Sequence, residues 1–354
     1  MPISSFEDGI LAGQSLNQGL LQSVRLVGEY RGKEALFKQQ SPQVLQALRE
    51  SAVIQSTESS NRIEGVVAPP QRIRDLVAKR TQPANRSEQE IAGYRDVLNT
   101  IHMNIADMPL TSGIVLQLHR DLFQFVPGGG GKWKNTDSDI TETRPDGIKV
   151  VRFKPLAAHL TPDAMQRLHD GYRQTLDAGA VEPLLSVATY VLDFLCIHPF
   201  ADGNGRMARL LSLLLLYQAG YEVGRYISLE GVIEETKEGY YDSLYTSSQG
   251  WHESRQSLVP WWEYFVGVML VKAYRKFDDR VGVTSARRGA KRDMTRDAVN
   301  RLPNRFRYAD LERALPAISR PTIARALREL RAEGAIRCLK PGRDATWGKI
   351  GPGA

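Results

Sequence analysis

Hydrophobic positions recur at helical spacing along most of the chain. In the N-terminal part Val44, Leu45, Leu48 and Val53 roughly follow this spacing, which is typical of a helix with one apolar face. Five further segments are predicted as helices: residues 114–125, 162–176, 183–196, 206–218 and 261–277. Gly65 fits a helix C-cap, because glycine tolerates the left-handed conformation there, so we expect the N-terminal helix to end near it.

One stretch breaks the helical spacing. Asp146-Gly147 is a typical hairpin turn. The β-branched and aromatic residues that follow it favour a strand; they are Ile148, Val150, Val151 and Phe153. Residues 141–153 therefore predict a short β-hairpin that is inserted among helices.

Changes in composition divide the chain into four predicted parts. Residues 1–95 form an N-terminal helical region, and residues 96–280 form a larger helical core that contains the hairpin. Residues 281–300 are rich in charges, contain two glycines and have few apolar residues, so they are the predicted linker. Residues 301–354 form a small separate domain. The predicted fold class is mainly α, with a small β-hairpin and a C-terminal domain.

The composition is that of a soluble globular protein. The 354 residues are 42% hydrophobic and 25% charged, close to the average for such proteins, and the length allows two or three domains. Cys196 and Cys338 are the only cysteines, which excludes a disulfide scaffold and a four-cysteine zinc site and indicates a reducing compartment.

No part of the sequence predicts contact with a membrane. The longest apolar stretch, residues 207–217, contains Arg209 and Ser212 and is shorter than the about 20 residues of a membrane span. The N-terminus has no basic region before an apolar stretch, so it does not resemble a signal peptide. We therefore expect a cytoplasmic protein.

The densest cluster of chemical groups lies between two apolar segments, at residues 198–209. Its members are His198, Asp202, Gly203, Asn204, Gly205, Arg206 and Arg209. A glycine-rich loop that leads into a helix exposes backbone N–H groups at the positive end of the helix dipole, where phosphate is the usual occupant. Arg206 and Arg209 are three residues apart and share a helix face, so their guanidinium groups suit a polyphosphate.

Two further side chains complete this cluster. Asp202 offers a hard oxygen ligand to a magnesium ion that bridges phosphates. His198 is placed to accept a proton from an attacking hydroxyl. A histidine or an Asp-Gly pair alone is typical of a capped helix end, but this combination within twelve residues is not. The cluster therefore predicts transfer of a phosphate-containing group to a hydroxyl.

The stretch HPFADGNGRMAR, residues 198–209, resembles the Fic-family signature HxFx(D/E)GNGRxxR at all its fixed positions. The resemblance implies a Fic-type helical bundle and an enzyme that transfers AMP from ATP to a Ser, Thr or Tyr hydroxyl of a target protein. It further implies that His198 is the general base, that Asp202 holds Mg²⁺ and that Phe200 is buried. The phosphates would be held by Gly203, Asn204, Gly205, Arg206 and Arg209.

A second motif also resembles this family. Residues 60–65, SNRIEG, fit its inhibitory pattern (S/T)xxxE(G/N). Ser60 and Glu64 are four residues apart, so they share a face of a helix. The resemblance implies that Glu64 pairs with Arg209 and displaces the γ-phosphate. Because the motif precedes the catalytic loop, the chain resembles the class with an N-terminal inhibitory helix. The alternative is an ordinary glutamate at a helix end.

Two other segments match positions that the family uses for binding. The hairpin near Arg144 to Phe153 falls where Fic proteins have a flap that holds the target segment by strand pairing; an ordinary surface hairpin is the alternative. Tyr240 and Tyr241 resemble tyrosines near the adenine pocket, and a tyrosine ring can stack on a base. Tyr240 is favoured as the nucleotide contact, and a core role is the alternative for both.

A glycine run at residues 128–131 is followed by Lys132 and resembles part of a P-loop. The P-loop pattern GxxxxGK[ST] requires Ser or Thr after the lysine, but Trp133 stands there and no strand pattern precedes the run. We therefore predict an ordinary loop.

The C-terminal segment predicts a winged helix-turn-helix. Ser319 is a plausible N-cap for a helix over residues 319–333, and two strands are predicted within residues 336–347. Residues 285–354 hold 17 of the 47 Lys and Arg and 7 of the 40 Asp and Glu. The rest of the chain, with 30 basic and 33 acidic residues, is near neutral. A DNA partner, a protein partner and a homodimer all stay open for this domain.

Three functions remain open at this level. The first is AMP transfer that is held back by Glu64. The second function uses the same site for a different reaction, which is removal of AMP or transfer of another phosphate-containing group. The third is a DNA-binding regulator whose Fic domain senses nucleotide, although sensing alone requires no base at His198.

Overall fold

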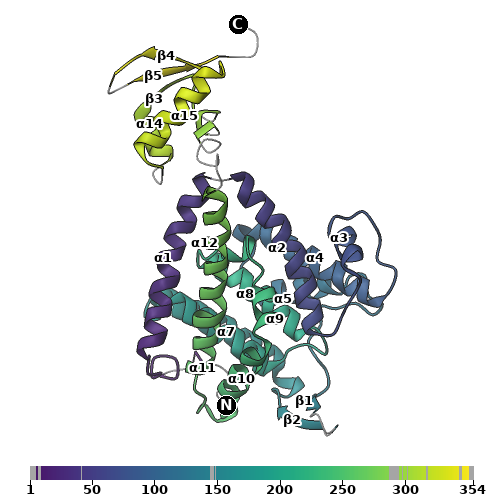
Figure 1. Cartoon of the computed structure of the whole chain (residues 1–354). Coiled ribbons are helices and arrows are strands. Elements are labelled where there is room, and N and C mark those ends of the chain that lie inside the picture. The colour runs from purple at the N-terminus through teal and green to yellow at the C-terminus, as the bar shows by residue number, and fades with distance from the viewer. Residues whose placement is uncertain are drawn as a thin grey trace. The chain divides into compact units, whose positions relative to one another are not determined.

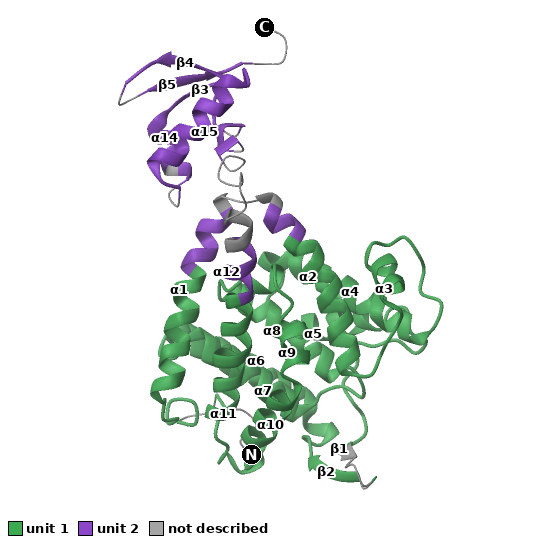
Figure 2. Cartoon of the chain, viewed as in Figure 1, with its two compact units in different colours: residues 1–31, 48–275 green, residues 32–47, 276–354 purple. Residues whose placement is uncertain are grey.

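The structure is a computed structural model that describes residues 5–6, 9–40, 42–143, 147, 149–286, 295–296, 298–300, 302–315, 318–342 and 345–350. It divides into two compact units (Figure 2). Unit 1 comprises residues 1–31 and 48–275, and unit 2 comprises residues 32–47 and 276–354. Three long helices contribute to both units: α1 (Gln18–Gln40), α2 (Pro42–Ile63) and α12 (Val271–Ala286).

Unit 1 is helical apart from one hairpin (Figure 1). Its other α-helices are α3 (Pro70–Val77), α4 (Arg86–Asn104), α5 (Ser112–Leu122), α6 (Thr161–Ala178), α7 (Pro183–Ile197), α8 (Asn204–Gln218), α9 (Leu229–Glu235), α10 (Lys237–Ser248) and α11 (Val259–Trp262). The π-helix η5 (Glu263–Leu270) continues α11 into α12. Short 3-10 turns are η1 (Ile105–Asp107), η2 (Ala158–Leu160), η3 (Val223–Arg225) and η4 (Trp251–Glu253).

The core of unit 1 is built around α7 and α8. Almost every residue of both helices is buried, and α7 packs against both α6 and α8. A helix that is apolar on all sides must be covered on all sides, which explains the continuous apolar runs in these two segments. The loop between α7 and α8 is thereby held between two fixed helix ends.

The predicted helices agree with the structure except at their boundaries. Residues 114–125, 162–176 and 183–196 correspond to α5, α6 and α7, while the predicted helix 261–277 is the succession α11, η5 and α12. The predicted helix 206–218 is α8, which begins two residues earlier, at Asn204. It does so because Gly203, with φ of 80°, forms the N-cap in the left-handed conformation that glycine adopts readily.

The predicted hairpin and the predicted end of α2 are confirmed. Strands β1 (Ile140–Thr143) and β2 (Lys149–Phe153) pair antiparallel, with Thr143 opposite Lys149. The predicted turn residue Asp146 and the predicted strand residue Ile148, like Arg144, lie outside the described residues. The last helical residue of α2 is Ile63, and Gly65 follows with φ of 77°.

The C-terminal part of unit 2 is a small α/β domain. Strands β3 (Arg305–Arg307), β4 (Ile336–Lys340) and β5 (Thr346–Lys349) form an antiparallel sheet in the order β3-β5-β4. Helices α14 (Tyr308–Ala314) and α15 (Arg320–Ala332) lie between β3 and β4 in sequence. The predicted helix 319–333 and two strands correspond to α15, β4 and β5, whereas β3 was not predicted. Ser319 is the N-cap residue, but its hydroxyl pairs with that of Thr322 rather than with the backbone.

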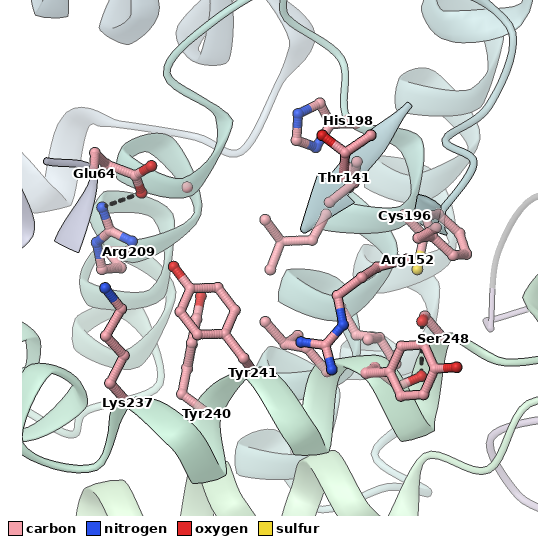
Figure 3. A pocket seen from close by; sticks show the side chains of 17 residues that line it. Glu64, Thr141, Arg152, Cys196, His198, Arg209, Lys237, Tyr240, Tyr241 and Ser248 are labelled. Carbon is pink, nitrogen blue, oxygen red and sulfur yellow. Dashed lines mark hydrogen bonds and ion pairs between the residues drawn. The ribbon is translucent and has the colours of Figure 1, made fainter. Parts of the chain in front are cut away.

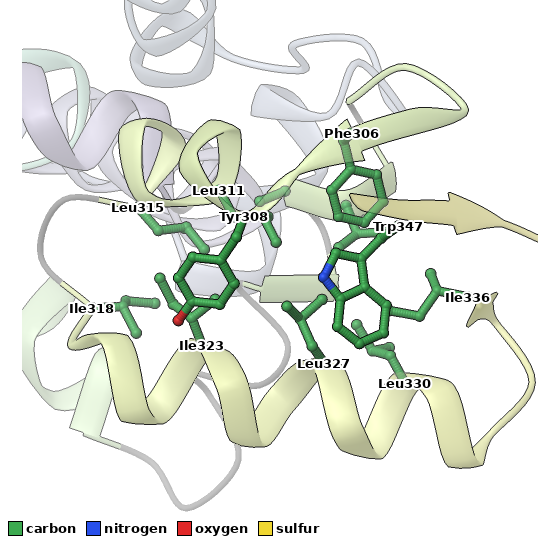
Figure 4. Close-up of a cluster of buried hydrophobic side chains, with 12 residues drawn as sticks. Phe306, Tyr308, Leu311, Leu315, Ile318, Ile323, Leu327, Leu330, Ile336 and Trp347 are labelled. Carbon is green, nitrogen blue, oxygen red and sulfur yellow. The ribbon is translucent and has the colours of Figure 1, made fainter. Parts of the chain in front are cut away.

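One apolar face of α15 forms the core of this domain (Figure 4). Ile323, Leu327 and Leu330 are buried against the sheet residues Phe306 and Trp347. The opposite face of α15 is consequently left to solvent.

In the predicted linker 281–300, helix α12 extends through residue 286, and the structure describes only residues 295–296 and 298–300 of the remainder. Among the described residues, no helix is long and apolar enough to cross a membrane.

Candidate active site

A cavity of about 600 Å³ lies beside the loop that joins α7 to α8. Of the predicted site residues, Glu64, His198, Gly205, Arg209, Tyr240 and Tyr241 line it. Figure 3 shows Glu64, Arg209 and Lys237 at one end of this cavity and Cys196 and Ser248 at the other. Elements far apart in sequence therefore enclose one site: the end of α2, the α7–α8 loop, α10 and the hairpin.

His198 occupies the C-cap of α7 in a left-handed conformation, with φ of 51°. A residue other than glycine in this region is strained and is held there by its surroundings. Its Nδ1 atom is buried and makes no regular hydrogen bond to the described residues, although the Leu195 backbone acts on the imidazole. Nε2 is therefore the nitrogen that we expect to exchange a proton with a group in the cavity. Burial lowers the pKa of His198 to about 4, and the nearby Lys134 ammonium contributes to this shift. The imidazole is therefore neutral at pH 7, as a general base must be.

The loop after His198 is fixed by its own side chains. Asn204 is buried; its Oδ1 accepts a hydrogen bond from the Phe200 N–H at 2.9 Å, and its Nδ2 donates to the Phe200 carbonyl at 2.7 Å. The Phe200 ring is fully buried, as predicted, and stacks on His119 with ring centroids 3.7 Å apart. At Gly203 a Cβ atom would lie 2.8 Å from the ring of Phe123. The side chain of Asn204 thus holds the loop closed and does not line the cavity.

The N-terminus of α8 opens toward the cavity. The first intrahelical hydrogen bond runs from the Met207 N–H to the Gly203 carbonyl. The N–H groups of residues 204–206 precede it and therefore have no acceptor within the helix. Gly205 lines the cavity at this end, where a Cβ atom would lie 2.3 Å from Glu64 Oε1. Glu64 thus places a carboxylate where the helix end favours an anion.

Arg209 connects α8 to the end of α2. Its Nη2 donates to Glu64 Oε1 at 2.8 Å and to the Ser60 carbonyl at 2.9 Å, and its Nε donates to Ser60 Oγ at 2.8 Å. The ion pair and hydrogen bond with Arg209 outweigh burial, which acts in the opposite direction, and lower the pKa of Glu64. Glu64 is therefore ionised at neutral pH, and Arg209 Nε and Nη2 both donate to the predicted inhibitory motif (Figure 3).

Arg206 points away from the cavity, although it shares a helix with Arg209. Its Nη1 donates to Glu90 Oε2 on α4 at 2.6 Å, with both side chains buried, and its guanidinium lies 5.1 Å from the ring centroid of Phe123. The sequence did not single out Glu90, because a pair separated by 116 residues leaves no local pattern. Arg206 lies beneath the loop, and in this conformation its contacts are with protein groups.

Asp202 lies at the edge of the site, with its side chain 61% exposed. Its Oδ1 accepts a hydrogen bond from the Gly203 N–H, and its carboxylate lies 3.7 Å from Arg206 and 3.8 Å from Arg86. Mg²⁺ is commonly held by one or two carboxylates together with substrate phosphates and waters. An exposed carboxylate beside a helix N-terminus fits that role. Among the described residues, no group of three or more His, Cys, Asp or Glu gathers as a metal site.

Two tyrosine rings from α10 line the cavity on the side of Glu64 and Arg209, and such rings can stack on a base. Tyr240 is buried, with 4% of its surface exposed, and Tyr241 is 36% exposed; their ring centroids are 5.2 Å apart. Lys237 lies 5.9 Å from the Tyr241 ring centroid. From the hairpin, Arg152 extends into the cavity over Tyr245, at 4.8 Å from the ring centroid (Figure 3). Lys237, Arg152 and Ser248 were not identified from the sequence, since no motif includes them.

The geometry places a histidine, the N-terminus of a helix and a β-hairpin around one cavity in a helical unit. Residues 109–216 match the profile of the Fic/DOC family. Over these residues, which include the loop that carries His198, the chain is similar to that family.

Similar proteins of known name agree with this assignment. The chain is 26% identical over 207 residues to the protein adenylyltransferase Fic of Drosophila grimshawi, which covers 57% of this chain and 41% of the relative. It is 25% identical over 230 residues to the protein of the same name from Drosophila ananassae, covering 62% and 44%. The chain thus spans less than half the length of these curated relatives.

Solved structures share the fold. A Fic family protein from Desulfovibrio desulfuricans matches with a TM-score of 0.63 and 21% identity over 96% of this chain and 98% of that one. A Fic domain containing signaling protein from Bacteroides thetaiotaomicron matches with a TM-score of 0.59 and 20% identity, over 74% of this chain and 98% of that one.

Proposed function

We propose that this protein transfers AMP from ATP to a Ser, Thr or Tyr hydroxyl of a target protein and that Glu64 inhibits the transfer. One observation carries the proposal: the Glu64 carboxylate pairs with Arg209 at 2.8 Å and covers Gly205 in the cavity that His198 lines. A carboxylate at that place competes with a phosphate for the same guanidinium and the same helix end. The names of the curated relatives support the choice of AMP as the transferred group.

The proposed reaction uses the residues as the structure arranges them. His198 accepts the proton of the target hydroxyl at Nε2, and the hydroxyl oxygen forms a bond to the α-phosphorus of ATP. The bond from that phosphorus to the bridging oxygen breaks, and pyrophosphate leaves. Arg209 and the N–H groups at the start of α8 offset the charge on the phosphates. Asp202 would hold Mg²⁺, which when bound neutralises phosphate charge. Tyr240 and Tyr241 would contact the base, and the hairpin β1–β2 would hold the target segment.

The proposal is tested by mass spectrometry of the Glu64→Gly protein after incubation with ATP and Mg²⁺, alone and with a cell lysate. We expect an AMP adduct on the protein itself or on a lysate protein. An ATP analogue with a methylene group between the α- and β-phosphorus cannot release pyrophosphate, so it should give no adduct. Tight ATP binding without any adduct would contradict AMP transfer, and release of AMP from an AMPylated target would favour the reverse activity.

For the C-terminal domain we propose duplex DNA as the partner, on an interpretation of β3 to β5 as a winged helix-turn-helix. The outer face of α15 carries Arg325, whose side chain is 77% exposed although it pairs with Glu329, and the exposed Arg328 and Arg331. The β4–β5 hairpin adds the exposed Arg337 and Lys340. An arginine-bearing helix beside a basic hairpin suits a helix in the major groove and phosphate contacts at its sides.

The salt dependence of DNA binding by the full chain tests this proposal. We expect the full chain to bind a random-sequence duplex in fluorescence anisotropy, with affinity that falls as salt rises. The double variant Arg325→Ala/Arg328→Ala should weaken binding and reduce the salt slope by about 2, since each lost phosphate contact reduces it by about 1. Arg173→Ala, at an exposed arginine on α6, is the control and should change neither quantity. Equal slopes for the double variant and the unaltered chain would exclude α15 as the contact surface.

A further inference from the structure

The glycine-rich loop at residues 128–134 is fitted closely against α5 in a way that the proposed reaction does not explain. A Cβ atom on Gly130 would lie 2.4 Å from the His119 carbonyl oxygen, and one on Gly131 would lie 2.8 Å from the Cβ of Arg120. The Gly131 N–H donates to His119 Nδ1 at 2.8 Å. Only glycine permits this approach, so the run of glycines fixes the path of the loop.

The same histidine joins this loop to the catalytic loop. Because Nδ1 of His119 accepts from Gly131, Nε2 carries the proton and donates to the Asp202 carbonyl, 3.0 Å away. Trp133, on the glycine-rich loop, also stacks on Phe200 with ring centroids 5.2 Å apart. Two contacts therefore connect the glycine-rich loop to the loop between α7 and α8: one runs through His119 to the Asp202 carbonyl, and the other through the Phe200 ring.

The glycine-rich loop ends at Lys134, which contacts the chain on both sides of His198. Its Nζ donates to the Ile197 carbonyl at 2.9 Å, and its backbone N–H donates to the Pro199 carbonyl at 2.8 Å. The side chain is only 5% exposed and does not line the cavity. Lys134 therefore lies outside the cavity, yet its side chain holds the carbonyl of the residue before the strained His198 and its backbone holds the carbonyl of the residue after it.

We propose that Lys134 is a positioning residue that holds His198 in its left-handed conformation through the Ile197 and Pro199 carbonyls. A left-handed conformation costs about 1–3 kcal/mol for a residue other than glycine and persists only where neighbouring contacts enforce it. Burying an ammonium group whose acceptor is a neutral carbonyl costs free energy. A neutral donor could form the same hydrogen bond without that cost. Burial lowers the pKa of Lys134 to about 8, so the ammonium form predominates at pH 7, and its charge adds to the burial that lowers the pKa of His198. Both effects prepare His198 to act as a base.

The test rests on the proposed function, so all rates are compared in the Glu64→Gly background. Lys134→Met should lower the rate of AMP transfer at saturating ATP by about 100-fold, since a misplacement of about 1 Å costs that much. The ATP dissociation constant, measured by calorimetry, should change less than two-fold. Lys134→Arg retains a long cationic donor and should restore most of the rate. Lys132→Met, at the exposed lysine two residues earlier, should keep the full rate.

Different results separate the possible errors. Full activity of Lys134→Met would overturn the inference and leave the proposed function intact. A joint loss of rate and ATP affinity that Lys134→Arg does not restore would also overturn it, because it indicates general damage. If the Glu64→Gly parent transfers nothing, the NMR signal of the His198 imidazole still tests the inference. That signal should shift in Lys134→Met and not in Lys132→Met, and an unshifted signal in both would refute it.

Discussion

Replacing Glu64 by glycine is expected to raise the rate of AMP transfer by about 10- to 100-fold, which corresponds to about 1.4–2.8 kcal/mol of barrier. The ionised carboxylate of Glu64 is 2.8 Å from Arg209 Nη2 and covers the first turn of α8. In the proposed reaction, ATP displaces this carboxylate before the phosphates reach the guanidinium and the backbone N–H groups. The Glu64→Gly variant removes this competition and leaves Ser60 to orient Arg209. The measurement is the initial rate of adduct formation by mass spectrometry.

Two matched variants separate charge from shape. Glu64→Gln keeps the size of the side chain and loses the charge, so an intermediate rate is expected if repulsion of phosphate contributes. Glu58→Gln changes a glutamate on α2 that pairs with Arg62 instead of Arg209 and should leave the rate unchanged. A Glu64→Gly protein that binds ATP no better and transfers no faster than the unaltered chain would show that Glu64 does not inhibit. A loss of AMP removal in this variant would instead assign Glu64 a part in that reaction.

The sequence was most informative where structure is local. The apolar runs of α7 and α8 predict two buried helices, and Gly65 predicts the end of α2, which it follows with positive φ. The spacing of Ser60 and Glu64 predicts a shared face, and both residues contact Arg209. These features depend on backbone preferences and helical periodicity, which a single sequence records.

Contacts between distant segments were not predictable in this way. Glu90 meets Arg206 across 116 residues, and Lys134 meets the Ile197 carbonyl across 63. Arg206 shares a helix face with Arg209 by spacing, but the buried Glu90 carboxylate turns it away from the cavity. Helix α8 begins two residues before the predicted start because the left-handed Gly203 caps it, and the Asn204 side chain holds this first residue to the Phe200 backbone. These features depend on contacts between residues far apart in the sequence or on side-chain conformation, and neither hydrophobic periodicity nor a short motif predicts them.

Replacing His198 by alanine is expected to reduce AMP transfer by about 100- to 10,000-fold, the usual contribution of a general base. The comparison is made in the Glu64→Gly background by initial rates at saturating ATP. ATP affinity should be retained, since His198 holds a proton and not a phosphate in the proposed reaction. His159→Ala, at an exposed histidine in η2, is the control and should keep the parent rate. An active His198→Ala protein would exclude this residue as the base.

The pH dependence of kcat/KM gives a second test of the same assignment, because it reports the ionisation of the free enzyme. Burial lowers the pKa of His198 to about 4, so the neutral, reactive form dominates at every pH above about 5. Between pH 8 and pH 6 we therefore expect kcat/KM of the Glu64→Gly variant to change less than two-fold. An imidazole with the ordinary pKa of about 6.5 would be mostly protonated at pH 6 and would lose about three-quarters of its reactive form. A four-fold fall over this range would show either that His198 is not kept neutral by its surroundings or that the base is another, more exposed group.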